Sequence, residues 1–423
     1  MIDPEEFKQR RLEKQQQRQQ QHRKLIVKLI LAAIFLVICG VLIFVLARPG
    51  TKTPEQTLPS ETQTATQGQA QPTETTAAEN KNTVIHFAAA GDMNITDNVV
   101  ASGGNENDYS LPFLDVAHLL SGADIAAMNF EGNLCDAPYG NTKSAPQSLA
   151  KAISNMGVDM LQLANSYTIH FGMHGLATTI NAVHAAGMEP LGVYASQADF
   201  KESQGYTIRN VQGVKIAFVA FTKGMNGLAL PAGNENCVNL LYTDYASTYQ
   251  QINTDGITAI LEAAEKEEPD ITVAMLHWGS EYNDTVSDSQ ETIKNLMLEN
   301  GVDIILGTHS HYLHKMEFNQ ENGTFVAYSL GDFFGDAQRS GSEYSVVLDL
   351  EITKNHETGE TKVTNFNYTP IFTVAEKDKP LKVLRISQAM KAFETGYIDR
   401  VSQATYDDLE YALQRIEARI QGE

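Results

Sequence analysis

Short apolar runs alternate with segments of helical periodicity along the chain from residue 84 onward. Runs of strand length occupy 84–90, 123–128, 158–164, 214–221, 271–276, 302–306 and 325–330. Apolar positions recur at helical spacing over 111–120, 175–186 and 288–299. The alternation predicts an α/β fold. Beyond residue 340, a hairpin of 345–352 with 361–368 and a helix over 404–420 are expected to complete it.

A long uncharged run near the N-terminus does not fit this alternation. The nineteen residues from Leu29 to Ala47 carry no charge, and Leu25 extends the apolar stretch beyond Lys28. A helix of that length spans roughly 28 Å, close to the hydrocarbon thickness of a bilayer. We therefore expect a transmembrane helix over 25–47. A cleaved signal peptide is the alternative, but its apolar region is usually shorter and ends in small residues.

The flanks of this run predict its orientation. Nine of the 31 Lys and Arg residues, but only four of the 52 Asp and Glu residues, lie in the first 48 positions. The positive-inside rule therefore places a basic, Gln-rich tail over 1–24 in the cytoplasm and the rest of the chain outside the cell membrane. Residues 48–82 are rich in Thr, Gln, Pro and Glu, a composition that cannot bury enough apolar surface to fold. We expect a disordered linker there.

One large folded domain is expected over 83–380, followed by a helical extension over 381–423. The net charge of the chain is −21, and because an acidic protein repels phosphate backbones, nucleic acid is not expected as a partner. Three cysteines are too few for a disulfide framework. Cys39 lies in the apolar run, whereas Cys135 and Cys237 could form one pair or remain buried thiols.

Residues that can bind metal or phosphate follow the strand-like runs. Asp92, Glu131, Asn165 and His277 each stand at or just after the end of such a run, and another run opens into Gly307-Thr308-His309-Ser310-His311. The carboxyl ends of strands in α/β sheets are where ligand sites assemble. Any one of these positions alone is better explained by a turn, a helix cap or a core histidine. Five such ends together predict one shared metal site.

The residue types favour a borderline divalent cation. Mn²⁺, Fe and Zn²⁺ accept imidazole and carboxylate ligands together, whereas Ca²⁺ favours oxygen ligands throughout. One or two such ions polarise a phosphoryl oxygen and lower the pKa of bound water to about 7. The expected reaction is therefore phosphoester hydrolysis.

Six ordered motifs over about 84–340 resemble those of the CapA family of bacterial poly-γ-glutamate capsule synthesis proteins, a branch of the metallophosphoesterase fold. They are Ala90-Gly91-Asp92, Asn129-Phe130-Glu131-Gly132, Leu163-Ala164-Asn165, Leu276-His277-Trp278-Gly279-Ser280-Glu281-Tyr282, Gly307-Thr308-His309-Ser310-His311 and Tyr328-Ser329-Leu330-Gly331-Asp332-Phe333. The resemblance implies a four-layer α/β/β/α sandwich with the site at one end of its two sheets. It also implies metal ligands at Asp92, Glu131, Asn165, His277, His309 and His311.

One position departs from the family pattern. Asn165-Ser166-Tyr167 stands where the family has Asn-Asn-His, so Tyr167 replaces the histidine expected to assist the phosphoryl group. The resemblance assigns the catalytic positions to Tyr167 and His277. A tyrosine has an unperturbed pKa of about 10 and is a poorer proton donor at neutral pH than imidazole. His170 and His174 lie nearby as substitutes, although exposed or helix-start histidines are the commoner outcome.

Several functions therefore remain open. The first is a membrane-anchored extracellular CapA-like protein that takes part in capsule synthesis or export, acting as a metal-dependent phosphoesterase on a phosphoester substrate. The second is a non-catalytic accessory that binds anionic polymer beside membrane capsule-synthase subunits. A general surface phosphatase is the third. Asp332, where the family has Asn, is a milder departure than Tyr167.

Overall fold

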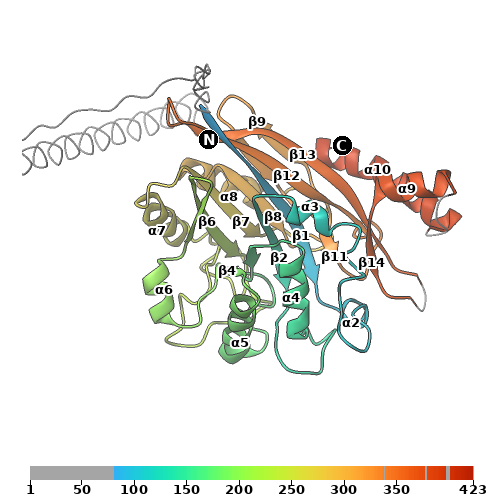
Figure 1. Cartoon of the computed structure of the whole chain (residues 1–423). Coiled ribbons are helices and arrows are strands. Elements are labelled where there is room, and N and C mark those ends of the chain that lie inside the picture. The colour runs from blue at the N-terminus through green and yellow to red at the C-terminus, as the bar shows by residue number, and fades with distance from the viewer. Residues whose placement is uncertain (1–80, 338, 377–378, 397–400, 423) are drawn as a thin grey trace, which may run out of the picture. The chain divides into compact units, whose positions relative to one another are not determined.

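The computed structural model describes residues 81–423 apart from 338, 377–378, 397–400 and 423 (Figure 1). Asn82–Glu423 form one unit. The predicted cytoplasmic tail and transmembrane helix, at 1–24 and 25–47, lie outside the described residues, and so does the linker predicted over 48–82 up to residue 80. Within the described part of the chain, no helix has both the length and the apolar character needed to cross a bilayer.

Sheet I contains eight strands among the described residues, in the order β14-β13-β12-β1-β2-β3-β4 with β11 beside β1. Strands β1 to β4 are parallel, whereas β12 runs antiparallel to β1 and pairs with β13 as the predicted hairpin. The bounds are β1 Asn82–Asn94, β2 Ile125–Glu131, β3 Met160–Gln162, β4 Glu189–Leu191, β11 Asp332–Phe334, β12 Tyr344–Asn355, β13 Thr361–Val374 and β14 Lys382–Arg385.

Sheet II contains six strands in the described range, in the order β5-β6-β7-β8-β10-β9. Its central strands β6, β7, β8 and β10 are parallel, and β5 and β9 close the edges in antiparallel pairing. The bounds are β5 Thr207–Val211, β6 Val214–Thr222, β7 Ile271–His277, β8 Ile304–Thr308, β9 Met316–Asn319 and β10 Thr324–Ala327.

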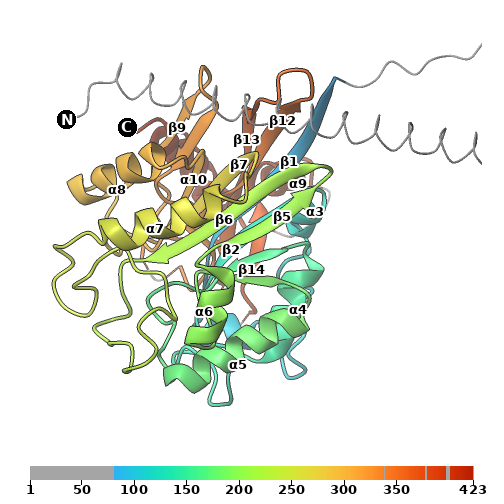
Figure 2. The ribbon, with the colours of Figure 1, turned by 90° about the vertical axis from the view of Figure 1, so that its left-hand side faces the viewer.

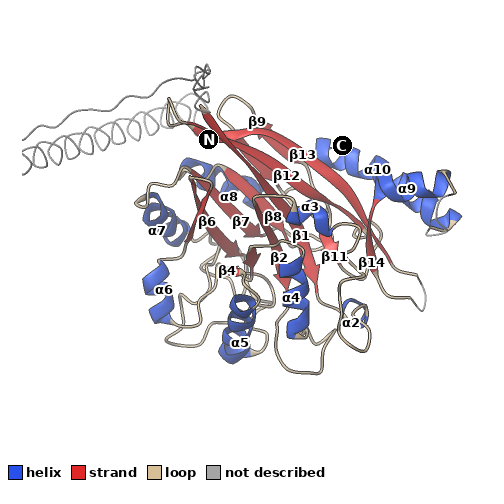
Figure 3. Ribbon diagram, in the orientation of Figure 1, coloured by secondary structure: helices blue, strands red, loops and turns tan. Residues whose placement is uncertain are grey.

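Helices cover the outer face of each sheet (Figures 2 and 3). One hydrophobic core lies between sheet I and the helices α3, α4 and α5. Another lies between sheet II and the helices α7 and α8. Between the sheets lies a third core, in which the rings of Phe87 and Phe218 meet edge to face at 5.8 Å. The helix bounds are α2 Asp97–Ala101, α3 Ala117–Ser121, α4 Gln147–Asn155, α5 Gly172–Ala185, α6 Gln197–Ser203, α7 Thr254–Glu265 and α8 Asp288–Glu299. The mixed α/β fold predicted from the apolar pattern is confirmed.

Two C-terminal helices cover part of sheet I that sheet II does not reach. Figure 1 shows α9 (Ile386–Glu394) and α10 (Gln403–Gln421) beside β13 and β14. Buried residues of α10, such as Leu409 and Ile416, belong to the same core as the residues between the sheets. The segment after residue 380 thus supplies both an edge strand and two helices.

The helix predicted over 111–120 is wrong for most of its length. Only α3, Ala117–Ser121, is helical there, and Leu111 and Leu114 are 75% and 62% exposed. Proline disfavours helical backbone in the residue before it, and Pro112 follows Leu111 directly. The carbonyl of Pro112 instead accepts a hydrogen bond from Val383 N in β14, at 2.9 Å. The segment is therefore tied to the edge of sheet I as a turn.

Candidate metal centre

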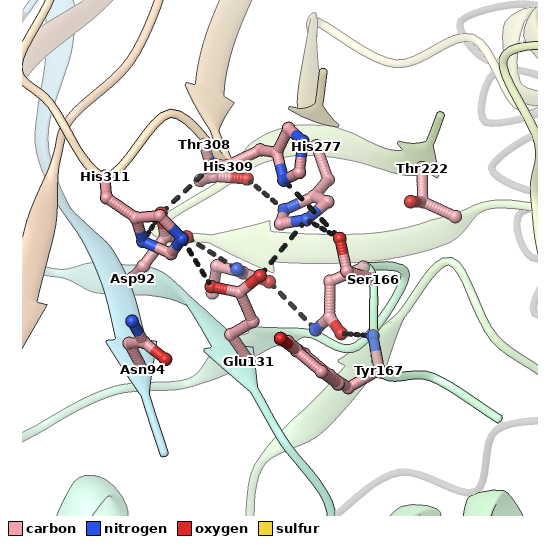
Figure 4. Close-up of polar contacts among 12 residues, drawn as sticks. Asp92, Asn94, Glu131, Ser166, Tyr167, Thr222, His277, Thr308, His309 and His311 are labelled. Carbon is pink, nitrogen blue, oxygen red and sulfur yellow. Dashed lines mark hydrogen bonds and ion pairs between the residues drawn. The ribbon is translucent and has the colours of Figure 1, made fainter. Parts of the chain in front are cut away.

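The predicted ligands lie at or just after the carboxyl ends of five strands, which are β1, β2 and β3 of sheet I and β7 and β8 of sheet II (Figure 4). In sheet I, β1 carries Asp92 near its end, and Asn94 pairs with Glu131 at the end of β2. In sheet II, His277 ends β7 and pairs with Thr308 at the end of β8. Because the strands in each pair are parallel, their ends open at one edge of their own sheet. Figure 4 shows side chains from both edges pointing toward a common space.

Asp92 is positioned by a close approach between two segments at Gly91. The N–H of Asp92 donates to the carbonyl oxygen of Gly331 at 2.9 Å. A Cβ placed on Gly91 would lie 1.8 Å from that oxygen, so a larger residue does not fit. The register of β1 against β2 also shifts between Ala89 and Asp92. The glycine of the first motif therefore allows the close approach of the two backbones that positions Asp92.

The loop after β8 holds two histidines in unusual backbone conformations. His309 has φ of 91° and His311 has φ of 60°, a region that side chains with a Cβ rarely adopt. The N–H of His309 donates to Asp92 Oδ2 at 3.1 Å, and the Ser310 hydroxyl donates to Ser329 Oγ at 2.9 Å. These bonds fix a strained turn that directs both imidazoles toward the strand ends.

A first group of ligand atoms comes from Glu131, His277 and His309. Their atoms lie within 4.8 Å of one another, and all three residues are buried. The distance from His277 Nε2 to Glu131 Oε1 is 3.5 Å, and the two imidazole rings are 4.4 Å apart. His277 Nδ1 lies 3.0 Å from Thr308 Oγ1. A hydrogen bond at the far nitrogen is typical of metal-binding histidine.

A second group of ligand atoms comes from Asp92, Glu131 and His311, again within 4.8 Å of one another. His311 Nε2 lies 3.8 Å from Glu131 Oε2, and its Nδ1 lies 3.9 Å from Asp92 Oδ2. Asp332 Oδ1 is 2.8 Å from the same Nδ1. Glu131 therefore belongs to both groups, with one carboxylate oxygen toward each.

The environment of the Glu131 carboxylate indicates whether the site suits a cation. Glu131 is buried, and neither of its side-chain oxygens has a hydrogen-bond partner. A buried carboxylate without hydrogen bonds is costly unless nearby positive charge balances it. Burial opposes ionisation of Glu131, but His311, His277 and His309 hold its pKa well below the usual range. Carboxylates and imidazoles together suit Mn²⁺, Fe or Zn²⁺, so the residues present fit one or two divalent ions.

The three imidazoles differ in charge. Burial lowers the pKa of His277 and of His309, so both are neutral near pH 7 and offer a lone pair to a ligand. Burial also opposes protonation of His311, but Asp332 and Glu131 outweigh it and raise the pKa of His311 to about 10. Without a bound cation the site therefore contains two neutral imidazoles and one imidazolium, and His311 must lose its proton before it can bind a metal.

Asn165 lies beside the ligand groups, and its side chain makes hydrogen bonds to neighbouring residues. Its Nδ2 donates to the Phe130 carbonyl at 2.6 Å and to Asn129 Oδ1 at 3.2 Å. Its Oδ1 accepts from the Tyr167 N–H at 3.0 Å. Asn129 in turn donates to Asp92 Oδ1 at 2.6 Å. The side chain predicted as a metal ligand thus joins a chain of amides that orients Asp92.

Tyr167 lies next to Glu131 in Figure 4. Lys143 Nζ is 4.5 Å above the centre of its ring. Burial and the negative charge of Glu131 raise the pKa of Tyr167 far above its ordinary value, so the phenol stays protonated. His170 and His174, the other candidates for the missing histidine, are both exposed.

Three residues of the centre were not among the predicted site residues. Asp332 reaches His311 because the short strand β11 pairs with β1, and Asp332 lies opposite Asp92. Thr308 bonds His277, and the Ser166 hydroxyl lies 3.0 Å from His277 Nε2. Asp332 and Thr308 stand inside the six motifs and Ser166 directly follows one of them, so the signal was their position next to a predicted ligand or within a motif. Cys135 and Cys237, whose pairing was left open, are free thiols.

The sequence matches a known family over the whole of this centre. Residues 86–337 match the family model described as bacterial capsule synthesis protein PGA_cap. The chain is 29% identical over 260 residues to the PGA biosynthesis protein CapA of Bacillus subtilis strain 168, covering 60% of this chain and 63% of that protein. It is 28% identical over 254 residues to the capsule biosynthesis protein CapA of Bacillus anthracis, covering 57% and 58%. The matched segment thus spans about three fifths of each relative.

The solved structures to which the chain is similar include a novel phosphatase from Mycoplasma pneumoniae. The TM-score is 0.41 at 12% sequence identity, and the match covers 69% of this chain and 94% of that one. Another is a putative 5'-nucleotidase from Staphylococcus aureus, with a TM-score of 0.43, 14% identity and coverage of 79% and 58%. The family match includes every residue of both ligand groups. Because it extends over more than half of the sequence, the chain belongs to the CapA family of bacterial capsule synthesis proteins.

Proposed function

We propose that this protein takes part in the synthesis or export of capsular poly-γ-glutamate and that its buried centre is a metal-dependent phosphoesterase site in a metallophosphoesterase-like sandwich. Membership of the CapA family supports the capsule role. One observation carries the metal-dependent chemistry: Glu131 is buried, has two unbonded oxygens and is shared by two ligand groups.

Each residue of the site would have a separate role in this reaction. Glu131, His277 and His309 would hold one cation, and Asp92, Glu131 and His311 a second, once His311 has lost its proton. When bound, such ions supply Lewis-acid polarisation of a phosphoryl oxygen. Tyr167, which keeps its proton, would donate a hydrogen bond to the phosphate.

The cellular setting is also part of the proposal. The uncharged run at 25–47 and the basic residues before it support a single membrane anchor with the folded domain outside the cell. Membrane capsule-synthase subunits and the anionic polymer would then be its partners. The acidic balance of the chain argues against nucleic acid.

Hydrolysis of p-nitrophenyl phosphate by the purified full-length protein tests the chemistry. Metal-free protein is expected to be inactive and to gain activity with Mn²⁺. Glu131→Gln, which keeps the side-chain shape, is expected to lose at least about 100-fold in rate. Turnover that needs neither the metal nor Glu131 would remove the proposal. Strong activity together with unchanged capsule on deletion of the gene would favour a general surface phosphatase.

A non-catalytic polymer-binding accessory is the second candidate, and Tyr167 favours it. The phenol, with its raised pKa, is a weak proton donor near pH 7. This function predicts that Glu131→Gln abolishes capsule formation although the wild-type protein shows no phosphoesterase turnover. Capsule formation that depends on turnover would exclude it.

A further inference from the structure

The hydroxyl of Ser166 lies between the two imidazoles of the first ligand group. Its Oγ is 3.0 Å from His277 Nε2 and 3.4 Å from His309 Nδ1. Ser166 is 3% exposed, and Figure 4 shows its side chain directed at the two rings. The serine hydroxyl therefore lies close to one ring nitrogen of each histidine, His277 Nε2 and His309 Nδ1.

The orientation of His277 supports a ligand role for this oxygen. A neutral imidazole carries its proton on one nitrogen only. With the proton on Nδ1, His277 donates to Thr308 Oγ1 at 3.0 Å, and the lone pair of Nε2 points toward Ser166 Oγ and Glu131 Oε1. A cation that takes this lone pair would lie beside the serine hydroxyl.

The oxygen of the neighbouring side chain, Asn165, already accepts a hydrogen bond from the backbone. Asn165 Oδ1 accepts from the Tyr167 N–H, and Asn165 Nδ2 donates to Phe130 and Asn129. Of these two adjacent residues, Ser166 is the one whose oxygen faces the imidazoles. The turn after β3 thus presents a hydroxyl, and not the carboxamide, to the first ligand group.

We propose that Ser166 Oγ is a further ligand of the cation held by Glu131, His277 and His309. This inference rests on the proposed metal centre. It gives that cation two imidazole nitrogens, one carboxylate oxygen and one hydroxyl oxygen, a four-donor set of the kind that Zn²⁺ and related ions accept.

Co²⁺ titration of metal-free full-length protein tests the assignment, with absorbance as the readout. Ser166→Cys replaces the oxygen by sulfur at nearly constant volume and is expected to give a thiolate-to-Co²⁺ charge-transfer band in the near ultraviolet. The wild type, which contains Cys39, Cys135 and Cys237, sets the baseline. Ser166→Ala is expected to weaken Co²⁺ binding by about 10-fold or more. Ser345→Ala is the matched control, because Ser345 is a buried serine whose hydroxyl has no partner.

The outcomes separate this inference from the proposed function. A Ser166→Cys protein that binds Co²⁺ without the new band, or a Ser166→Ala protein with wild-type affinity, would overturn the ligand role of Ser166 alone. If the wild type binds no Co²⁺, or binds it equally after Glu131→Gln, both the inference and the metal centre fail. Circular dichroism of each metal-free variant checks that it is folded.

Discussion

At the scale of single residues, the chemistry of the centre depends on which side chains keep a proton near neutral pH. Burial leaves His277 and His309 neutral, whereas the carboxylates around His311 keep it charged. Tyr167 stays protonated because burial and Glu131 raise its pKa. A phenol of this kind is a hydrogen-bond donor and a poor general acid.

Replacing Tyr167 with histidine is therefore expected to increase phosphoester hydrolysis. Tyr167→His should raise kcat in Mn²⁺ by about 100-fold, because an imidazole gives up a proton more readily. Tyr167→Phe removes only the hydroxyl and should change the rate by less than about tenfold. Steady-state kinetics with p-nitrophenyl phosphate measure both. A Tyr167→His rate no higher than wild type would contradict the role given to this position.

A second prediction at this scale concerns His314 and the pH dependence of stability. Its Nε2 lies 2.7 Å from the Asn283 carbonyl oxygen, Nδ1 has no partner, and burial lowers its pKa. The unfolded chain, with an ordinary histidine pKa near 6.5, therefore binds the proton more readily. The stability that this histidine contributes is present above pH 6.5 and falls as the pH drops below it, by at most about 1.4 kcal/mol per pH unit.

His314→Gln, which keeps a donor for the Asn283 carbonyl, should flatten this decline. Urea unfolding in EDTA at several pH values between 7.5 and 5.5 measures the free energy of unfolding of both proteins. Two curves of the same slope would show that His314 does not contribute.

At the scale of elements, the centre depends on how strands end. Glu131 ends β2 and His277 ends β7, in parallel strand pairs, so the strand directions bring each side chain to the carboxyl edge of its own sheet, and the packing of the two sheets brings these edges together. The position of Asp92 also depends on the close approach of β1 to the backbone at Gly331. A small change at this contact should therefore disturb both the fold and the site.

Gly91→Ala is expected to lower the free energy of unfolding by about 2–4 kcal/mol, because the added methyl group would clash with the Gly331 carbonyl. Val84→Ala in the same strand is the control, since Val84 is 43% exposed and its loss should cost less than about 1 kcal/mol. Denaturant unfolding measures both. Equal stability of the two variants would mean that the contact between Gly91 and Gly331 tolerates a side chain at residue 91.

The strand ends could be predicted from the sequence because each apolar run stops at a polar residue. The different contacts of Asn165 and Ser166 could not be predicted, since both residues follow the same run and the turn geometry decides that Ser166 lies beside His277 whereas Asn165 bonds Asn129 and Phe130. Asp332 was missed as a site residue because it reaches the centre through a three-residue strand, β11, that is too short to show a period. The edge strands β5 and β9 have mixed polarity and gave no apolar run either.

At the scale of the whole molecule, the C-terminal helices close a face that would otherwise meet water. Leu409, Ala412, Ile416 and Ile420 are all buried against the core that includes β12 and β13. Burial of such side chains stabilises by about 1.5–3 kcal/mol for each large aliphatic residue. The helix is thus part of the domain's core.

Deletion of residues 401–423 is therefore expected to produce aggregated or unfolded protein. Size-exclusion chromatography and thermal unfolding measure this outcome. Tyr411→Ser, on the 53% exposed position of α10, should leave both measurements unchanged. A monomeric truncated protein with the wild-type melting temperature would show that α10 is dispensable.

The central claim is that side chains from both sheets meet around a cation through Glu131. Inductively coupled plasma mass spectrometry of the purified full-length protein tests it most directly. The account predicts one or two equivalents of Mn, Fe or Zn per chain in the wild type and almost none in folded Glu131→Gln, because both ligand groups contain this residue. Metal-free wild type, or equal metal in the two proteins, would contradict it.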